Sequence, residues 1–204
     1  MLVLERSNAS QGGGTNRWPA ELHRAGSLLQ LRRGESVYAE GDDADGVYFL
    51  VAGGLKLVRR TPSRGDFILD LVWPGGVFGE EGALAGRRRL ARALALSDSR
   101  FLHVTRSSLS ELFRSSPMVA FDLLERMARR QGAIFERMLE LTWPKPADRI
   151  ASAHERLSDL VGGGAEGARV AVADVAAHAC ASTHAVRTHL ASGNDVSTYA
   201  VDDA

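Results

Sequence analysis

The stretch from Pro117 to Leu141 constrains this 204-residue chain most, because it predicts one long helix with two apolar faces. Proline suits the first turn of a helix, where its missing N–H would have no intrahelical partner. The helix should end at Trp143-Pro144-Lys145-Pro146, since proline cannot continue a helix and restricts the residue before it. Two apolar faces on one helix require a packing partner on each face.

One of these faces repeats at alternating spacings of four and three residues, which is typical of the a/d seam of a coiled coil. Within it, Gln131 favours pairing between two chains, because a polar seam residue costs stability but fixes register. We therefore expect a homodimer, with burial of both faces in one monomeric core as the alternative. The predicted dimer seam consists of Leu124, Met127, Gln131, Ile134, Met138 and Leu141.

The chain before this helix has the pattern of an antiparallel β-barrel or sandwich. Short apolar or alternating runs from Leu28 to Val104 are separated by turns rich in glycine or aspartate. A short helix should follow, with Ser108 and Glu111 as its capping box. A second stripe on the long helix is expected to pack on the barrel. The clearest strands are Val47–Val51, Leu55–Val58, Phe67–Val72 and Phe101–Val104, and the second stripe is Phe121, Ala128, Phe135 and Leu139.

The chain after the prolines predicts a helix-turn-helix. One helix should cover Val172–Ala179, and a second should begin after the N-cap Ser182 and run to Leu190. The β-prone segment Val196–Val201 can form a wing strand. With a flexible tail rich in polar residues and glycine, these patterns predict an α+β fold in four parts. The parts are the tail at 1–17, the barrel at 18–116, the dimerisation helix at 117–143 and the helix-turn-helix domain at 144–204.

Composition narrows the possible functions. The 25 basic and 25 acidic residues balance, so any basic surface must be local. Cys180 is the single cysteine, which excludes an internal disulfide and a site that needs several thiolates, and we expect no metal. The N-terminus lacks a signal-peptide pattern and no apolar run is long enough to span a bilayer, so we expect a cytoplasmic protein with no membrane partner. Because no nucleophile, base and orienting group can be assembled, we expect no enzyme.

The segment Pro74-Gly75-Gly76-Val77-Phe78-Gly79-Glu80, with Arg89-Leu90-Ala91-Arg92-Ala93 after it, resembles the phosphate-binding cassette of the cyclic-AMP receptor and anaerobic-regulator family. The resemblance continues through the long helix, Asp148-Arg149-Ile150-Ala151 and the segment Asp174–Leu190. It implies a jelly-roll barrel of the cyclic-nucleotide-binding type, a homodimer, and a C-terminal winged helix-turn-helix, here shortened. The partners that it implies are DNA and RNA polymerase. The ligand pocket that it implies contains Gly79, Glu80, Arg89, Leu90, Ile134 and Phe135.

Two departures from the family pattern argue against cyclic AMP. The family's cyclic-AMP binders have Ser or Thr directly after the cassette arginine, whereas this chain has Leu90, and Ile134-Phe135 replaces the Thr-Ser pair that holds the adenine. Each lost partner of a buried polar group costs about 1–3 kcal/mol, so we expect no cyclic-nucleotide cofactor. Three interpretations stay open: Ile134 and Phe135 fill the pocket, they line an apolar site for another effector, or Glu80 and Arg89 pair with each other.

By resemblance, the second helix of the helix-turn-helix presents Ser182, Thr183, His184, Arg187 and Thr188 to DNA, with Val186 as a buried anchor. From residue 165 to the end, the cations are Arg169 and Arg187 against five acidic residues, whereas phosphate binding normally needs several Lys or Arg. The prediction is a homodimeric DNA-binding transcription regulator that does not respond to cyclic AMP. The alternative is a dimeric sensor or protein-interaction module whose DNA-binding domain is degenerate.

Overall fold

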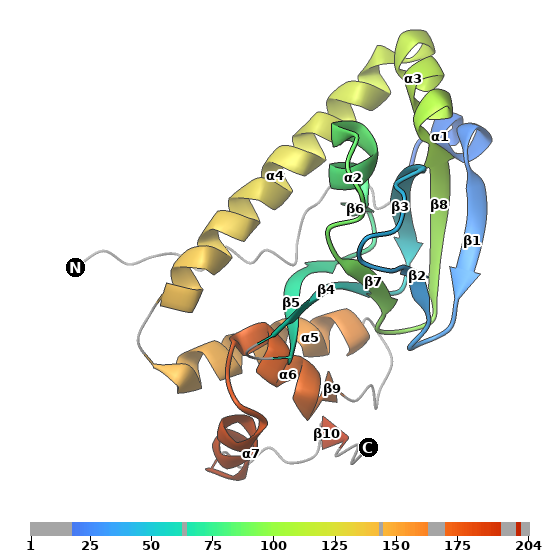
Figure 1. Cartoon of the computed structure of the whole chain (residues 1–204). Helices are drawn as coiled ribbons and strands as arrows, with labels where there is room; N and C mark the ends of the chain where they lie inside the picture. Colours follow the sequence, from blue (N-terminus) through green and yellow to red (C-terminus); the bar gives the residue numbers. More distant parts are fainter. Residues whose placement is uncertain (1–17, 63–64, 143–144, 163–169, 193–198, 201–204) are drawn as a thin grey trace.

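The computed structural model describes residues 18–62, 65–142, 145–162, 170–192 and 199–200 (Figure 1). An N-terminal barrel, one long helix and a group of C-terminal helices follow one another along the chain, which confirms the predicted α+β fold. The predicted tail at 1–17 lies outside the described residues. No helix in the described part of the chain is long and apolar enough to cross a membrane.

Two four-stranded antiparallel sheets form the barrel. Alternating apolar side chains from both sheets fill the space between them, and the rings of Tyr48, Phe78 and Phe101 lie at its centre. All four of the clearest predicted strands are present. In spatial order, one sheet contains β1 (Ser27–Leu31), β8 (Ser99–Thr105), β3 (Gly46–Ala52) and β6 (Val77–Phe78), and the other contains β2 (Ser36–Tyr38), β7 (Arg92–Ala95), β4 (Leu55–Thr61) and β5 (Gly65–Val72).

Three short helices accompany the barrel: α1 (Ala20–Ala25), α2 (Glu80–Ala85) and α3 (Arg106–Ser115). The prediction that Ser108 caps α3 is wrong, because the helix begins two residues earlier. Its N-cap is Thr105, the last residue of β8, whose hydroxyl accepts a hydrogen bond from the Ser108 N–H at 3.2 Å. The extended backbone at the strand end already places this hydroxyl over the first turn, so no further cap is needed.

The long helix α4 (Pro117–Thr142) begins at the predicted proline and extends from α3 to the C-terminal helices (Figure 1). The prediction that the Phe121, Ala128, Phe135 and Leu139 stripe packs on the barrel is wrong, since Phe121 is 62% exposed and Phe135 57%. Val119 and Leu123 are buried against the barrel instead. Farther along the helix, arginines take over this contact, because carbonyl groups and carboxylates of the barrel face α4 there.

The C-terminal part contains α5 (Pro146–Gly162), α6 (Val172–Ala179) and α7 (Thr183–Ser192). As predicted, α6 and α7 form two helices around a tight turn: Cys180 has φ 53°, and the Ser182 hydroxyl accepts from the Ala185 N–H at 3.1 Å. Val186 is fully buried, which confirms its predicted role as an anchor. Two short strands, β9 (Val170–Ala171) and β10 (Tyr199–Ala200), pair in parallel, and the rest of the predicted wing strand lies outside the described residues.

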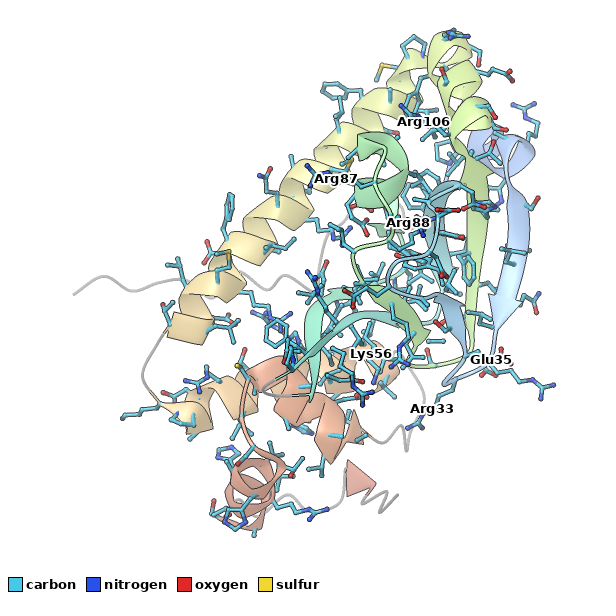
Figure 2. The ribbon with its side chains drawn as sticks, in the orientation of Figure 1. Arg33, Glu35, Lys56, Arg87, Arg88 and Arg106 are labelled. Carbon is cyan, nitrogen blue, oxygen red and sulfur yellow. The ribbon has the colours of Figure 1, made fainter. Side chains whose placement is uncertain are left out.

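The C-terminal helices share a hydrophobic cluster with the barrel. Ile68 and Leu71 of β5 belong to the same cluster of buried side chains as Leu157 of α5 and Val175 of α6. At its edge, the ammonium of Lys56 on β4, which Figure 2 labels, binds the Asp174 carboxylate on α6. The helix-turn-helix is therefore held against the second sheet of the barrel, and the proline-rich connection is not its only attachment.

Candidate functional site

The cassette is a tight connection between β6 and α2. Gly79 lies between them with φ 76°, a left-handed conformation that favours glycine. A Cβ atom at this position would also lie 2.4 Å from Nη1 of Arg89. Glycine is therefore required twice, for the turn and for the close approach of the arginine.

The guanidinium of Arg89 is buried and already bound by the protein. Its Nη1 donates to the Gly79 carbonyl at 2.7 Å, and its Nη2 donates to the Gly46 carbonyl at 2.9 Å and to Oδ1 of Asp45 at 3.0 Å. Its charge also lies over the ring of Tyr38, 4.4 Å from the ring centroid. The planar fork that would hold a phosphate in the cassette is thus occupied by protein acceptors.

Glu80 contacts α4 and does not contact Arg89. Its Oε1 accepts from Nη1 of Arg130 at 2.7 Å, and Arg130 also donates through Nε to Asp70 at 2.6 Å. The interpretation that Glu80 and Arg89 pair with each other is therefore wrong. The Arg130 side chain is only 24% exposed, and it forms the centre of this ion-pair network.

The sequence of α4 contains a signal for the face of the helix that meets the barrel. Arg126, Arg130 and Arg137 are four and seven residues apart, so they lie on one side of the helix. Arg126 donates to the Gly75 carbonyl at 2.9 Å, so all three arginines bind barrel groups. A face occupied by buried arginines resembles a solvated face in its pattern, and only the position of the barrel distinguishes the two.

Burial changes the titration of the groups around the cassette. Burial raises the pKa of the Glu80 carboxyl, although the Arg130 guanidinium acts in the opposite direction. Burial alone would lower the pKa of Arg130, but Glu80 and Asp70 raise it above its usual value. Burial also raises the pKa of Tyr38. The Tyr38 hydroxyl, Oε2 of Glu80 and Nε of Arg89 are buried without a hydrogen-bond partner.

The other predicted pocket residues are exposed. Leu90 is 43% exposed, Ile134 37% and Phe135 57%, so in the single chain neither Ile134 nor Phe135 fills the barrel. The structure thus brings Gly79, Glu80 and Arg89 together with Arg130. Groups of three or more His, Cys, Asp or Glu side chains that could hold a metal ion are absent from the described part of the chain.

Two further surfaces stand out. The predicted DNA-contact residues Ser182, Thr183, His184, Arg187 and Thr188 are all exposed on the first two turns of α7 and at its cap. In the predicted seam of α4, Leu124 is 63% exposed and Met138 59%, Gln131 is also exposed, and Met127 and Leu141 are half-buried. A monomer rarely leaves such an apolar stripe in water.

Residues 28–116 match the model of the cyclic nucleotide-binding domain family. The chain is 30% identical over 138 residues to the cyclic AMP receptor protein of Thermus thermophilus, a match that covers 66% of this chain and 64% of that protein. It is 26% identical over 134 residues to a CRP-like cAMP-activated global transcriptional regulator of Mycobacterium tuberculosis, covering 66% of this chain and 60% of the relative. The chain therefore aligns with less than two thirds of the length of these relatives.

The fold is also similar to that of a c-di-GMP responsive global regulator from Xanthomonas campestris. The two structures superpose with a TM-score of 0.71 at 17% identity, over 89% of this chain and 97% of the other. At this identity the likeness concerns the fold alone. It covers more of the chain than the sequence matches do.

Proposed function

We propose that this chain, which belongs to the cyclic-AMP receptor and anaerobic-regulator (CRP/FNR) family, is a homodimeric DNA-binding transcription regulator. The observation that carries the proposal is the exposed face of α7, which follows a tight turn and presents hydroxyl, imidazole and guanidinium groups. Such a helix can enter a major groove while Val186 holds it on the protein. The Mycobacterium tuberculosis relative is a global transcriptional regulator, which supports a non-enzymatic role.

The dimer would form through the outer side of α4. Leu124 and Met138 are exposed there on a helix of 26 residues, whose opposite side is fixed to the barrel by Val119, Leu123 and the arginines. A second copy would cover this stripe, with Gln131 setting the register. Sedimentation at micromolar concentration tests this: Leu124→Glu should give monomers, and Glu125→Gln, at the next position, should not.

DNA binding is tested by fluorescence anisotropy with a generic duplex over a series of salt concentrations. Contacts with phosphate make the logarithm of affinity fall linearly with the logarithm of salt concentration. We expect such a slope, and Arg187→Ala should make it shallower by about one unit per lost phosphate contact in each protomer. Arg114→Ala, an exposed arginine of α3, is the matched control and should leave the slope unchanged.

We further propose that cyclic AMP is not the effector. A cyclic phosphate would have to displace three hydrogen bonds that Arg89 already makes, and Leu90 offers no hydroxyl in return. Calorimetric titration with cyclic AMP and cyclic GMP should therefore show no heat of binding at micromolar ligand. Micromolar affinity for either nucleotide would contradict this proposal and leave the DNA-binding proposal intact.

The acidic C-terminal part favours a second candidate, a dimeric sensor or protein-interaction module. Few basic residues accompany Arg187 in this part, whereas generic DNA binding normally uses several. A dimer that shows no salt-sensitive binding to the duplex would support this second function against the first.

A further inference from the structure

The barrel contacts of α4 define which side of this helix faces outward (Figure 1). Val119, Leu123, Arg130 and Arg137 meet the barrel, and because successive helical residues are about 100° apart, these four lie within about 40° of one another around the helix axis. The seam predicted from the sequence is centred about 75° from this barrel face, and its member Met127 packs partly against the barrel core. The predicted seam thus runs along one edge of the exposed side, beside the barrel.

A second set of α4 residues lies almost opposite the barrel, and we call it the outer seam. Its members alternate at spacings of three and four residues, as the a and d positions of a coiled coil do. The outer seam is centred about 135° from the barrel face, and every one of its residues is exposed. It combines part of the predicted seam with most of the stripe that the sequence assigned to the barrel. Its residues are Phe121, Leu124, Ala128, Gln131, Phe135 and Met138.

The charge along the outer seam suits contact with an identical helix. Across a two-fold axis a surface meets its own copy, so charges on it would face like charges at a cost. The outer seam contains no charged residue. Of the positions beside it in α4, all of which the structure describes, Glu125 alone carries a charge, and Arg129 one turn later pairs with it. A neutral face favours a second copy of the chain over DNA or a charged protein segment.

The apolar area of this side is large enough for a stable dimer. A large apolar side chain that is about half exposed leaves roughly 100 Å² in water. Two copies would therefore cover on the order of 1,400 Å² in total, which lies within the range of specific protein interfaces. The large apolar side chains of the outer seam and its flanks, each 37–69% exposed, are Met118, Phe121, Leu124, Ile134, Phe135, Met138 and Leu139.

We propose that two copies of the chain pair in parallel through the outer seam, with Ile134 of one protomer packed on Leu139 of the partner subunit. In this arrangement Gln131 keeps its place in the seam, and Met127 stays beside the barrel. The inference rests on the proposed function, because only a parallel pair brings both copies of α7 to the same end of the dimer, where one duplex can meet them. In an antiparallel pair, the C-terminal ends of the two 26-residue helices would lie about 39 Å apart.

Disulfide crosslinking locates the seam, because two cysteines can join only where their Cα atoms lie within about 7 Å of each other. One cysteine is placed at Ala128, which belongs to the outer seam alone, or at Met127, which belongs to the predicted seam alone. Both variants carry Cys180→Ser, so the introduced cysteine is the only thiol of the full chain. Under mild oxidation at micromolar protein concentration, Ala128→Cys should form covalent dimers at least tenfold faster than Met127→Cys.

Two further positions test the parallel orientation. Leu124→Cys and Met138→Cys, in the same background, should both crosslink. An antiparallel pair cannot crosslink at both positions, because they lie about 21 Å apart along the helix.

The outcomes separate the seam from the dimer itself. Crosslinking of Met127→Cys as fast as that of Ala128→Cys would overturn the outer seam and leave the homodimer intact. A chain that sediments as a dimer but crosslinks at neither Ala128, Leu124 nor Met138 would overturn it as well. A chain that sediments as a monomer at micromolar concentration, with no crosslink at any position, would contradict the homodimer of the proposed function.

Truncation of Phe135 gives a second measurement that needs no cysteine. Phe135 is exposed in the single chain, so Phe135→Ala should fold, and it should raise the dimer dissociation constant at least tenfold, as truncation of a central aromatic residue does at many interfaces. Glu136→Ala, at the next and likewise exposed position, is the matched control and should dimerise as the parent does. An unchanged dissociation constant in Phe135→Ala would overturn the proposal.

Discussion

Replacement of Arg137 by Met tests how the helix-turn-helix is held on the barrel. Arg137 is 8% exposed and donates to the carbonyls of Ile68 at 2.7 Å, Leu69 at 2.8 Å and His178 at 3.0 Å. One side chain of α4 thus joins β5 to α6. Methionine retains much of the aliphatic stem and removes all three donors, so the change isolates the hydrogen bonds from the packing.

The expected loss of unfolding free energy in Arg137→Met follows from two opposing contributions. Hydrogen bonds that involve a charged group contribute about 1.5–3 kcal/mol each, so three contribute roughly 4.5–9 kcal/mol. Burial lowers the pKa of Arg137 from its ordinary value to about 10, which corresponds to a cost of about 3 kcal/mol for the buried charge. The guanidinium is charged in both states at pH 7, so this cost applies there in full. The free energy of unfolding should therefore fall by about 4 kcal/mol in Arg137→Met.

Urea denaturation followed by circular dichroism measures this loss, and small-angle scattering shows whether the C-terminal helices leave the barrel. Arg129→Met is the matched control, because Arg129 lies on the same helix, its side chain is 64% exposed, and it pairs with the exposed Glu125. The control should change the free energy of unfolding by less than about 1 kcal/mol. A loss of unfolding free energy in Arg137→Met within about 1 kcal/mol of this control, with an unchanged scattering profile, would refute the conclusion that Arg137 holds α6 on β5.

Three further predictions concern Arg130 and Gly79 around the cassette and His178 of α6. Arg130→Met leaves the carboxylate of Glu80 buried without its cation and should cost about 3–5 kcal/mol in urea denaturation, with Glu80→Gln in the same background restoring part of it. Gly79→Ala places a Cβ 2.4 Å from Nη1 of Arg89 at φ 76°, so it should lower the free energy of unfolding by more than about 2 kcal/mol. Its control is Gly86→Ala, at φ 66° in open space, which should lower this free energy by about 1 kcal/mol. Equal melting temperatures of the two variants would contradict the steric argument. Because the pKa of His178 is lowered to about 2, the unfolded state binds a proton below pH 6.5 that the folded state does not bind. The free energy of unfolding should therefore fall by about 1.4 kcal/mol for each pH unit below 6.5. His178→Phe should remove this part of the pH dependence.

Local patterns in the sequence predicted most of the elements but not the orientation of the long helix. Strands such as Leu55–Val58 and the helix Val172–Ala179 follow from alternation, capping and turn residues, which act over a few positions. The faces of α4 could not be assigned in this way. Its apolar stripes satisfy helical periodicity on both sides, and the side that meets the barrel is chosen by acceptors such as Asp70 and Glu80, which are distant in sequence. The interpretation that Glu80 pairs with Arg89 was wrong for the same reason, because Asp45 and two carbonyls, all distant in sequence from Arg89, bind its guanidinium.

The arginines of α4 connect the two sites of the molecule. Arg130 binds Glu80 of the cassette, and Arg137, seven residues or about 10.5 Å farther along the same helix, binds the His178 carbonyl of α6. The two contacts thus lie on one helix, and neither arginine can change partners without leaving carbonyls or carboxylates unsatisfied. Since these bonds form between protein groups alone, the position of α6 is set without a ligand in the cassette. For the regulator proposed above, an effector would be needed to release α6 and α7, and none to hold them.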